Sequence, residues 1–356
     1  MINSFTVENF RCFNSLTIDR LARINLIAGK NNSGKTSLLE ALLLQSNPNG
    51  PAVPSLLNMH RGLPYVFDPD DLWGWLFYNK DTGATISFQA DYGNGSRQLR
   101  LRLEVATESL VQPPPTNGTD GAGSTTSLLA PPRPRQLLLY FTDEHGRNGT
   151  ASAFATLQNV QSTFANVEPY VPGFYSILAP NLTAVDADRF SRLEEIGRGG
   201  EILDGLRTIE PRLTRLVPLF TGGQPVFHGD IGIGRLVPLP VMGEGVVRLA
   251  QILIGIAFSH TSSALIDEIE NGLHHTVVES VWTAIADAAR RADVQVFATT
   301  HSWECITAAH KAFEKCDEGE FALHRLSTSR KTGKISVTTY DRETLAAALE
   351  GGFEVR

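Results

Sequence analysis

Cysteine is scarce in this sequence, with only Cys12, Cys305 and Cys316 among 356 residues. Their spacing matches no metal-ligand pattern, and three thiols are too few for a disulfide framework. Also absent is any apolar run near the ~20 residues that a membrane-spanning helix requires. The first residues show neither the basic segment nor the apolar core of a secretory signal. We therefore expect a cytoplasmic protein that does not enter a membrane.

Basic residues are in the minority, since 31 Lys and Arg stand against 38 Asp and Glu and leave a net charge of −7. This balance disfavours a uniformly basic DNA-binding surface, although a local groove could still be positive. Hydrophobic residues make up 42% and charged residues 19%, an ordinary globular composition. A chain of this length predicts two domains or one elaborated domain.

The sequence matches the phosphate-binding pattern G-x-x-x-x-G-K-[ST] at residues 29–36. A strand expected at 24–28 and an apolar helix expected at 37–44 flank the loop, which disfavours a chance match. Such a loop presents unpaired backbone N–H groups to an anion. We expect Lys35 to reach the β- and γ-phosphates of ATP and the Thr36 hydroxyl to ligate Mg²⁺. The residues expected to bind nucleotide here are Gly29, Asn31, Asn32, Ser33, Gly34, Lys35, Thr36 and Ser37.

A second cluster of motifs begins with two glycines in the segment 242–245, just before an apolar helix expected at 247–259. This is another helix N-terminus able to face an anion. A strand is expected next, at 263–266, and Asp267 and Glu268 follow it directly. An apolar strand followed by Asp-Glu fits a Walker B motif. Asp267 would hold Mg²⁺ and Glu268 would polarise the attacking water. The alternative, an acidic pair in a turn, is disfavoured by the P-loop pattern upstream.

A histidine follows the last buried strand of this region, which is expected at 294–299 and leads into His301. A histidine in this place can stabilise charge that develops on the γ-phosphate. The alternative is a core histidine bonded to a backbone carbonyl. The neighbours His274 and His275 point in different directions on this interpretation, which disfavours a shared metal site.

The middle of the chain is less informative. Alternating patterns predict strands at 84–88, 98–104 and 136–141, and a segment rich in Pro, Gly, Ser and Thr at 112–135 predicts a mobile surface loop. Residues 190–220 are expected to be mainly helical, because apolar residues recur there near the helical period.

Two smaller features of the middle region have competing interpretations. Asp186 and Asp188 could be a metal pair, but a turn or helix cap is favoured. Trp73 and Trp75 are interpreted as core packing rather than as a stacking platform. Near the C-terminus, strands at 321–326 and 335–340 should form a hairpin.

The motifs resemble a known family. The segment FTVENFRCFNSLTIDRLARINLIAGKNNSGKTSLLEAL resembles the opening of ABC-type ATPases of the SMC, RecF and OLD (overcoming lysogenization defect) group. The segments LIDEIENGLHH and VQVFATTHSWECI are similar to the OLD-family ATPase domain. The likeness covers residues 1–45 and 240–310, under a third of the chain.

The resemblance implies an α/β P-loop NTPase fold of ABC-ATPase type. A mixed central sheet would carry an N-terminal antiparallel β-subdomain over the base and sugar of ATP. Residues 1–48 and 240–356 would form the nucleotide-binding core, and 49–239 would form an inserted β-rich and helical lobe. Two copies would pair head to tail on ATP, so that the signature at 243–248 covers the γ-phosphate held by the other copy.

The resemblance also assigns roles to single residues. Asp267 completes the metal site begun by Thr36, and Glu268 is the catalytic base. The segment 272–274 stands where a D-loop does, and His301 is the switch histidine. The signature residues expected to contact the partner's nucleotide are Gly243, Glu244 and Gly245, with Arg248 closing the motif.

Two departures narrow the family. The signature M-G-E-G-V differs from the L-S-G-G-Q of transporters, which disfavours a transporter subunit. A Q-loop glutamine has no clear place, since Gln45 comes too early.

Too few residues follow His301 for the Toprim nuclease domain of full OLD proteins, which needs about 100 residues. We therefore expect that domain to be absent.

Two functions remain open on sequence grounds. The first is an ATPase and ATP-dependent dimeric switch in DNA repair or phage defence, for which a separate nuclease or other effector and DNA are the candidate partners. The second is a scaffold held together by ATP with negligible turnover. The presence of Lys35, Asp267 and Glu268 favours the first.

Overall fold

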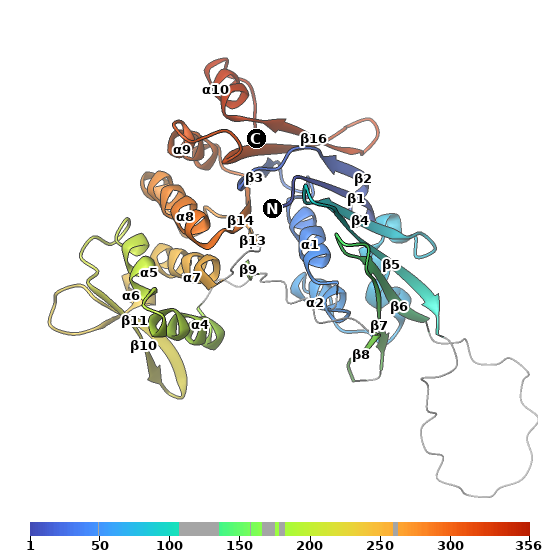
Figure 1. Cartoon of the computed structure of the whole chain (residues 1–356), viewed down its shortest axis with the longest axis horizontal. Helices are drawn as coiled ribbons and strands as arrows, with labels where there is room; N and C mark the ends of the chain where they lie inside the picture. The colour runs from blue at the N-terminus through green and yellow to red at the C-terminus, as the bar shows by residue number, and fades with distance from the viewer. Residues whose placement is uncertain (49, 107–134, 157, 166–174, 178–181, 259–262) are drawn as a thin grey trace, which may run out of the picture.

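A computed structural model describes residues 1–356 except 49, 107–134, 157, 166–174, 178–181 and 259–262 (Figure 1). The loop expected at 112–135 therefore lies outside the described residues, apart from Arg135. No helix in the described part of the chain is long and apolar enough to cross a membrane.

The central sheet has six strands in the order β16-β15-β3-β14-β13-β9. All neighbours in it are parallel except β15 and β16, so the expected mixed sheet is confirmed. Its strands are β3 (Ile24–Gly29), β9 (Tyr175–Ile177), β13 (Ser263–Ile266), β14 (Gln295–Thr300), β15 (Phe321–Thr328) and β16 (Ile335–Tyr340).

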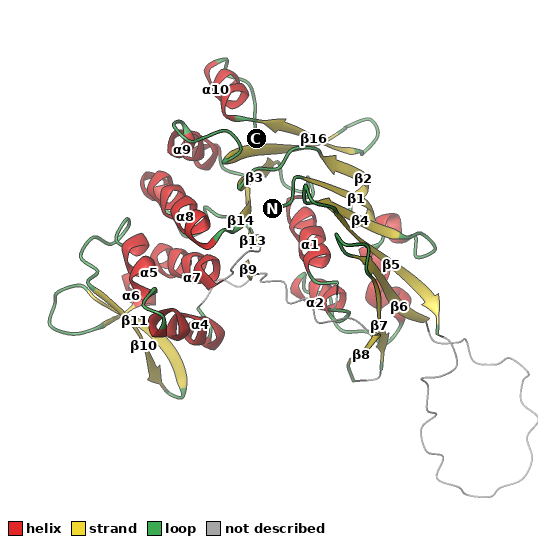
Figure 2. Ribbon diagram, viewed as in Figure 1, coloured by secondary structure: helices red, strands yellow, loops and turns green. Residues whose placement is uncertain are grey.

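Alternate side chains of the central strands enter two different cores. On β3, Leu26 belongs to the core on one face and Ile27 to the core on the other, because successive side chains of a strand point to opposite faces. Helices α7 (Glu244–Phe258), α8 (Val278–Ala292) and α9 (Trp303–Phe313) cover the first face. Helix α1 (Lys35–Ser46) covers the second (Figure 2).

A second, antiparallel sheet of seven strands packs over α1 in the order β2-β1-β4-β5-β6-β7-β8. The three strands expected between 84 and 141 are confirmed, and an antiparallel pair, β1 and β2, precedes them in the chain. One sheet thus contains strands from both sides of residue 48, where the sequence placed a boundary between core and lobe. The strands are β1 (Ser4–Phe10), β2 (Phe13–Ile18), β4 (Ile86–Asp91), β5 (Ser96–Val105), β6 (Arg135–Thr142), β7 (Asn148–Ala155) and β8 (Val160–Ala165).

Two short helices, α2 (Val53–His60) and α3 (Pro69–Trp73), connect α1 to this sheet and are followed by the 3₁₀ turns η1 (Gly74–Leu76) and η2 (Tyr78–Lys80). Trp73 is fully buried there, as expected. The expectation for Trp75 is wrong, because its side chain is 54% exposed and lies under the Lys80 ammonium.

The helical prediction for 190–220 is wrong beyond residue 206. Helices α4 (Ala184–Glu195) and α5 (Gly199–Leu206) are followed by a hairpin of β10 (Arg215–Thr221) and β11 (Gln224–Asp230). Pro218 cannot donate the hydrogen bond that a helix interior needs, and both turn glycines have positive φ. Strand β12 (Val237–Pro238) and helix α6 (Leu239–Met242) then lead to the signature.

The helix-cap interpretation of Asp186 is confirmed. Its carboxylate accepts from the Thr183 N–H at 2.8 Å, and the Thr183 hydroxyl accepts from the Asp186 N–H, so the two close a capping box at the start of α4. Asp188 pairs with Arg192 one turn along the same helix. At the other end of the chain, Asp341 caps α10 (Arg342–Glu350).

Candidate functional site

The glycine loop between β3 and α1 leaves no room for larger side chains at its two ends. A Cβ atom on Gly29 would lie 2.4 Å from the Ser33 Oγ and 2.8 Å from the Leu326 carbonyl oxygen. Gly34 has φ +96, and a Cβ there would lie 2.8 Å from the Phe13 ring. The loop is therefore fixed by close packing as well as by backbone conformation.

Lys35, the first residue of α1, folds back across this loop. Its Nζ donates to the Gly29 carbonyl at 2.7 Å and to the Lys30 carbonyl at 3.1 Å. Burial lowers the pKa of the Lys35 ammonium from its ordinary value, and nearby carboxylates partly offset this. A phosphate in the loop would meet an ammonium already held beside the backbone that cradles it.

Thr36 and Asp267, 231 residues apart in sequence, meet at the carboxyl edge of the central sheet. The Thr36 hydroxyl donates to Asp267 Oδ2 at 2.9 Å, and the Thr299 hydroxyl donates to the other carboxylate oxygen. Mg²⁺ prefers oxygen ligands and is commonly bound by one or two carboxylates together with substrate phosphates. The Thr36 hydroxyl and the Asp267 carboxylate therefore fit such an ion.

Glu268 is held in an unusual backbone conformation beside this pair. Its φ is +48, in the left-handed region that few non-glycine residues adopt, and its N–H donates to Thr299 Oγ1 at 2.8 Å. Asn271 Nδ2 donates to Glu268 Oε2 at 2.6 Å. The Glu268 side chain is 47% exposed, so its carboxylate is fixed in place yet open to water.

His301 lies directly after β14, where its ring faces two carboxylates. Nδ1 is 3.3 Å from Glu270 Oε1 and 3.8 Å from Glu268 Oε1. The side chain is 46% exposed, so the alternative of a core histidine is wrong. Glu270 did not stand out in the sequence, although it lies in the same short segment as the Walker B pair.

The signature at the start of α7 packs against the turn that follows Walker B. A Cβ on Gly245 would lie 2.9 Å from the Gly272 carbonyl oxygen, and one on Gly272 would lie 2.8 Å from the Glu244 side chain. Gly243 has φ +129. Glycines at 245 and 272 therefore bring the signature and the turn at 272–274 together, while α7 covers the face of the sheet opposite α1.

Arg248 requires a correction. The sequence placed it with the residues that act on a second copy, but it is only 7% exposed and its Nη2 donates to the Asp267 carbonyl at 2.6 Å. It thus ties the signature helix to the Walker B segment of its own chain. Gln45, considered and set aside as a Q-loop residue, is also buried and donates to the Arg97 carbonyl at 3.0 Å.

An ion-pair cluster that the sequence did not reveal lies behind the P-loop. Glu40 on α1 accepts from Arg61 Nε at 2.7 Å and from Arg11 Nε at 3.1 Å. Arg61 also donates to Ser37 Oγ at 3.1 Å. A lone acidic residue within an apolar helix was the only signal. The cluster fixes α1 to the β1–β2 turn and to the end of α2.

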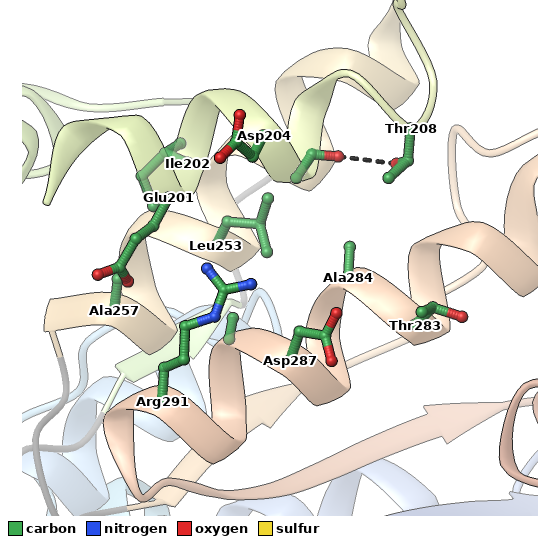
Figure 3. A pocket seen from close by; sticks show the side chains of 12 residues that line it. Glu201, Ile202, Asp204, Thr208, Leu253, Ala257, Thr283, Ala284, Asp287 and Arg291 are labelled. Atoms are coloured by element: carbon green, nitrogen blue, oxygen red, sulfur yellow. Dashed lines mark hydrogen bonds between the residues drawn. The ribbon is translucent and has the colours of Figure 1, made fainter. Parts of the chain in front are cut away.

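A hollow of about 180 Å³ lies between α5, α7 and α8, away from these motifs (Figure 3). Its lining includes the apolar Leu253 and Ala284 and the charged Asp287 and Arg291. The Thr208 hydroxyl donates to the Gly205 carbonyl. None of the residues expected from sequence to form the site takes part in it.

The chain resembles known proteins in sequence. The chain is 22% identical over 337 residues to an "ATP/GTP phosphatase" of Helicobacter pylori, covering 89% of this chain and 90% of that protein. A 44-residue segment is 50% identical to the uncharacterized protein MJECL10 of Methanocaldococcus jannaschii, covering 12% of this chain and 20% of that protein.

Solved structures of SMC head domains share the fold. The SMC head bound to the C-winged helix domain of ScpA matches with a TM-score of 0.53 at 12% identity, covering 97% of this chain and 99% of that one. An SMC head with an extended coiled coil, bound to the C-terminal domain of ScpA derived from Pyrococcus furiosus, gives 0.51 at 10% identity and covers 98% of each chain. The fold is thus that of ABC-type P-loop ATPases.

One family model spans the chain from the P-loop strand to the helix after His301, at residues 24–305. Its ends coincide with the first and last motifs of the site described above. The chain belongs to the family described as "AAA domain, putative AbiEii toxin, Type IV TA system".

Proposed function

We propose that this chain binds ATP with Mg²⁺ and hydrolyses it. The observation that carries the proposal is the 2.9 Å contact between the Thr36 hydroxyl and the Asp267 carboxylate, with Glu268 next in sequence. When bound, Mg²⁺ would neutralise charge on the β- and γ-phosphate oxygens. The nucleotide would lie on the loop at 29–37.

The protein's own groups divide the remaining work. Lys35 and the backbone N–H groups of the loop bind the phosphates. Glu268, exposed to water and held by Asn271, accepts the proton of the attacking water. His301 faces the same region from the neighbouring strand and stabilises charge on the γ-phosphate. The name of the Helicobacter pylori relative, "ATP/GTP phosphatase", supports hydrolysis of ATP or GTP.

We further propose that a second copy completes the site. The signature helix and α1 cover opposite faces of the central sheet, so Gly243, Glu244 and Gly245 suit a nucleotide held by another chain. The turn at 272–274 packs on the signature and would approach that nucleotide with it. ATP would then hold two head-to-tail copies together, because each copy would contact the nucleotide that the other one binds.

The biological setting we propose is DNA repair or phage defence, with a separate effector. The OLD-like sequence segments support this, and the family description, which names a toxin of a toxin–antitoxin system, supports a partner chain. The SMC heads of the same fold are bound to ScpA domains in their structures, which supports the proposal of a protein partner.

The test is steady-state phosphate release from ATP and from GTP, with and without DNA. Wild type should hydrolyse ATP in the presence of Mg²⁺. Asp267→Asn should lose this hydrolysis, because a neutral amide replaces the carboxylate that accepts from the Thr36 hydroxyl. Glu279→Gln, an exposed change on α8, is the matched control. ATP-induced dimers without any turnover would instead support the ATP-held scaffold.

A further inference from the structure

Glu270 directs one carboxylate oxygen at the segment that carries His301. Its Oε1 accepts from the Thr300 hydroxyl at 2.8 Å and from the His301 N–H at 2.9 Å, and lies 3.3 Å from His301 Nδ1. The other oxygen, Oε2, is buried and has no hydrogen-bond partner among the described residues. The side chain as a whole is 13% exposed.

This arrangement is unfavourable for stability alone. A buried carboxylate oxygen without a partner loses its hydration and receives nothing in exchange. The hydrogen bonds that Glu270 does make hold the His301 backbone N–H and the Thr300 hydroxyl, and they keep Oε1 beside the His301 ring. Its placement is therefore explained by what it does to His301.

We propose that Glu270 is a positioning residue that acts through His301, an inference that rests on the proposed ATPase function. In this role the His301 Nδ1–H would donate to Glu270, which would leave Nε2, on the opposite side of the ring, for the nucleotide or the attacking water. A carboxylate partner that fixes the tautomer and orientation of a functional histidine is a common arrangement.

Glu270 also keeps His301 away from the base. Glu268 Oε1 lies 3.8 Å from the same nitrogen, so two carboxylates compete for Nδ1. In the absence of Glu270, the ring would turn to Glu268, which would occupy both the histidine and the carboxylate that must accept a proton. Removal of Glu270 should therefore slow the chemical step and leave ATP binding nearly unchanged.

The kinetic test uses Glu270→Gln, whose amide oxygen can still accept from Thr300 and from the His301 N–H. We expect kcat to fall roughly 10- to 100-fold with little change in KM, as for other groups that orient a functional side chain. In a His301→Ala background, Glu270→Gln should lower kcat little further, because the ring that Glu270 positions is already gone. Glu279→Gln should leave kcat unchanged. The proposal would be overturned if Glu270→Gln and His301→Ala lowered kcat independently, so that their effects multiplied in the double variant. A rise in KM with kcat unchanged in Glu270→Gln would also overturn it.

A second measurement does not depend on turnover. Long-range ¹H–¹⁵N correlation spectra of the histidine rings report which nitrogen carries the proton, and His301→Gln assigns the signal. We expect His301 to carry a proton on Nδ1 in the wild type and to lose this preference in Glu270→Ala. Identical His301 signals in the two proteins would refute the role of Glu270. The expected spectra in a protein that does not hydrolyse ATP would uphold the contact and reject the ATPase proposal.

Discussion

Acidification should destabilise this protein through one buried histidine. His324 on β15 is fully buried between two strands, with Nε2 3.1 Å from Asn25 Oδ1 and Nδ1 3.0 Å from the Thr339 hydroxyl. Asn25 Nδ2 donates to the Ala22 and Val296 carbonyls, so its Oδ1 is the acceptor and His324 carries its proton on Nε2. Nδ1 can then accept from the Thr339 hydroxyl, which is the arrangement of a neutral ring.

Burial lowers the pKa of His324 from 6.5 to about 4. Because the folded pKa is below the unfolded one, the neutral ring stabilises the fold fully above pH 6.5. This contribution is lost as the pH falls from 6.5 towards 4, because the unfolded chain takes up the proton first. With about 1.4 kcal/mol for each pKa unit, the free energy of unfolding should fall by about 3 kcal/mol at pH 4.

The assay is urea unfolding at pH 7 and at pH 4, for wild type and for His324→Gln. Other groups titrate in both proteins, so the difference between them isolates the histidine. We expect the wild type to lose about 3 kcal/mol more than the variant on acidification. Equal losses would refute the reasoning, because they would mean that His324 takes up its proton equally in the folded and unfolded states.

Three further predictions concern the cluster behind the P-loop, the aspartate pair and the second copy. Glu40→Ala should lower the free energy of unfolding by roughly 3–5 kcal/mol, since it leaves the Arg11 guanidinium, 7% exposed, without its carboxylate; a urea midpoint near wild type would contradict this. Asp186→Ala should cost about 1 kcal/mol of stability, because the capping box loses its carboxylate while the Thr183 cap remains. The purified chain with ATP and Mg²⁺ or Mn²⁺ should leave plasmid and linear DNA intact, and cleavage that disappears in that variant would reveal a second active site. An equal mixture of Lys35→Ala and Gly245→Asp should regain some ATPase activity, because one composite site is intact, and no recovery at concentrations that support dimers would count against action between copies.

Much of the fold could be predicted because its signals are local. The strand before the P-loop and the strands that precede Asp267 and His301 are short apolar runs, and each lies in the central sheet. The failure at Arg215–Thr221 is also local in origin. Leu213 and Leu216 have helical spacing, but a proline and a two-glycine turn determine the structure there.

The contacts within the site were only partly predictable. The motif patterns gave the residue types for phosphate, metal and base, but not their partners. Thr299 and Glu270 contact residues some 30 positions away along the chain, and those contacts depend on how β13 and β14 pair. Arg248 lies in the signature, which the resemblance to ABC-type ATPases places against a second copy. Its side chain is nevertheless buried within its own chain.

The most direct test of the account is the fate of ATP bound to Glu268→Gln. Wild type and variant would each be incubated with labelled ATP and Mg²⁺, separated from free nucleotide, denatured, and the released nucleotide identified. The account predicts ADP from the wild type and intact ATP from the variant, with hydrolysis slowed about 10²–10⁴-fold, since the metal and phosphate ligands remain while the base is lost. Hydrolysis by the variant at the wild-type rate would contradict the assignment of Glu268 and with it the proposed mechanism.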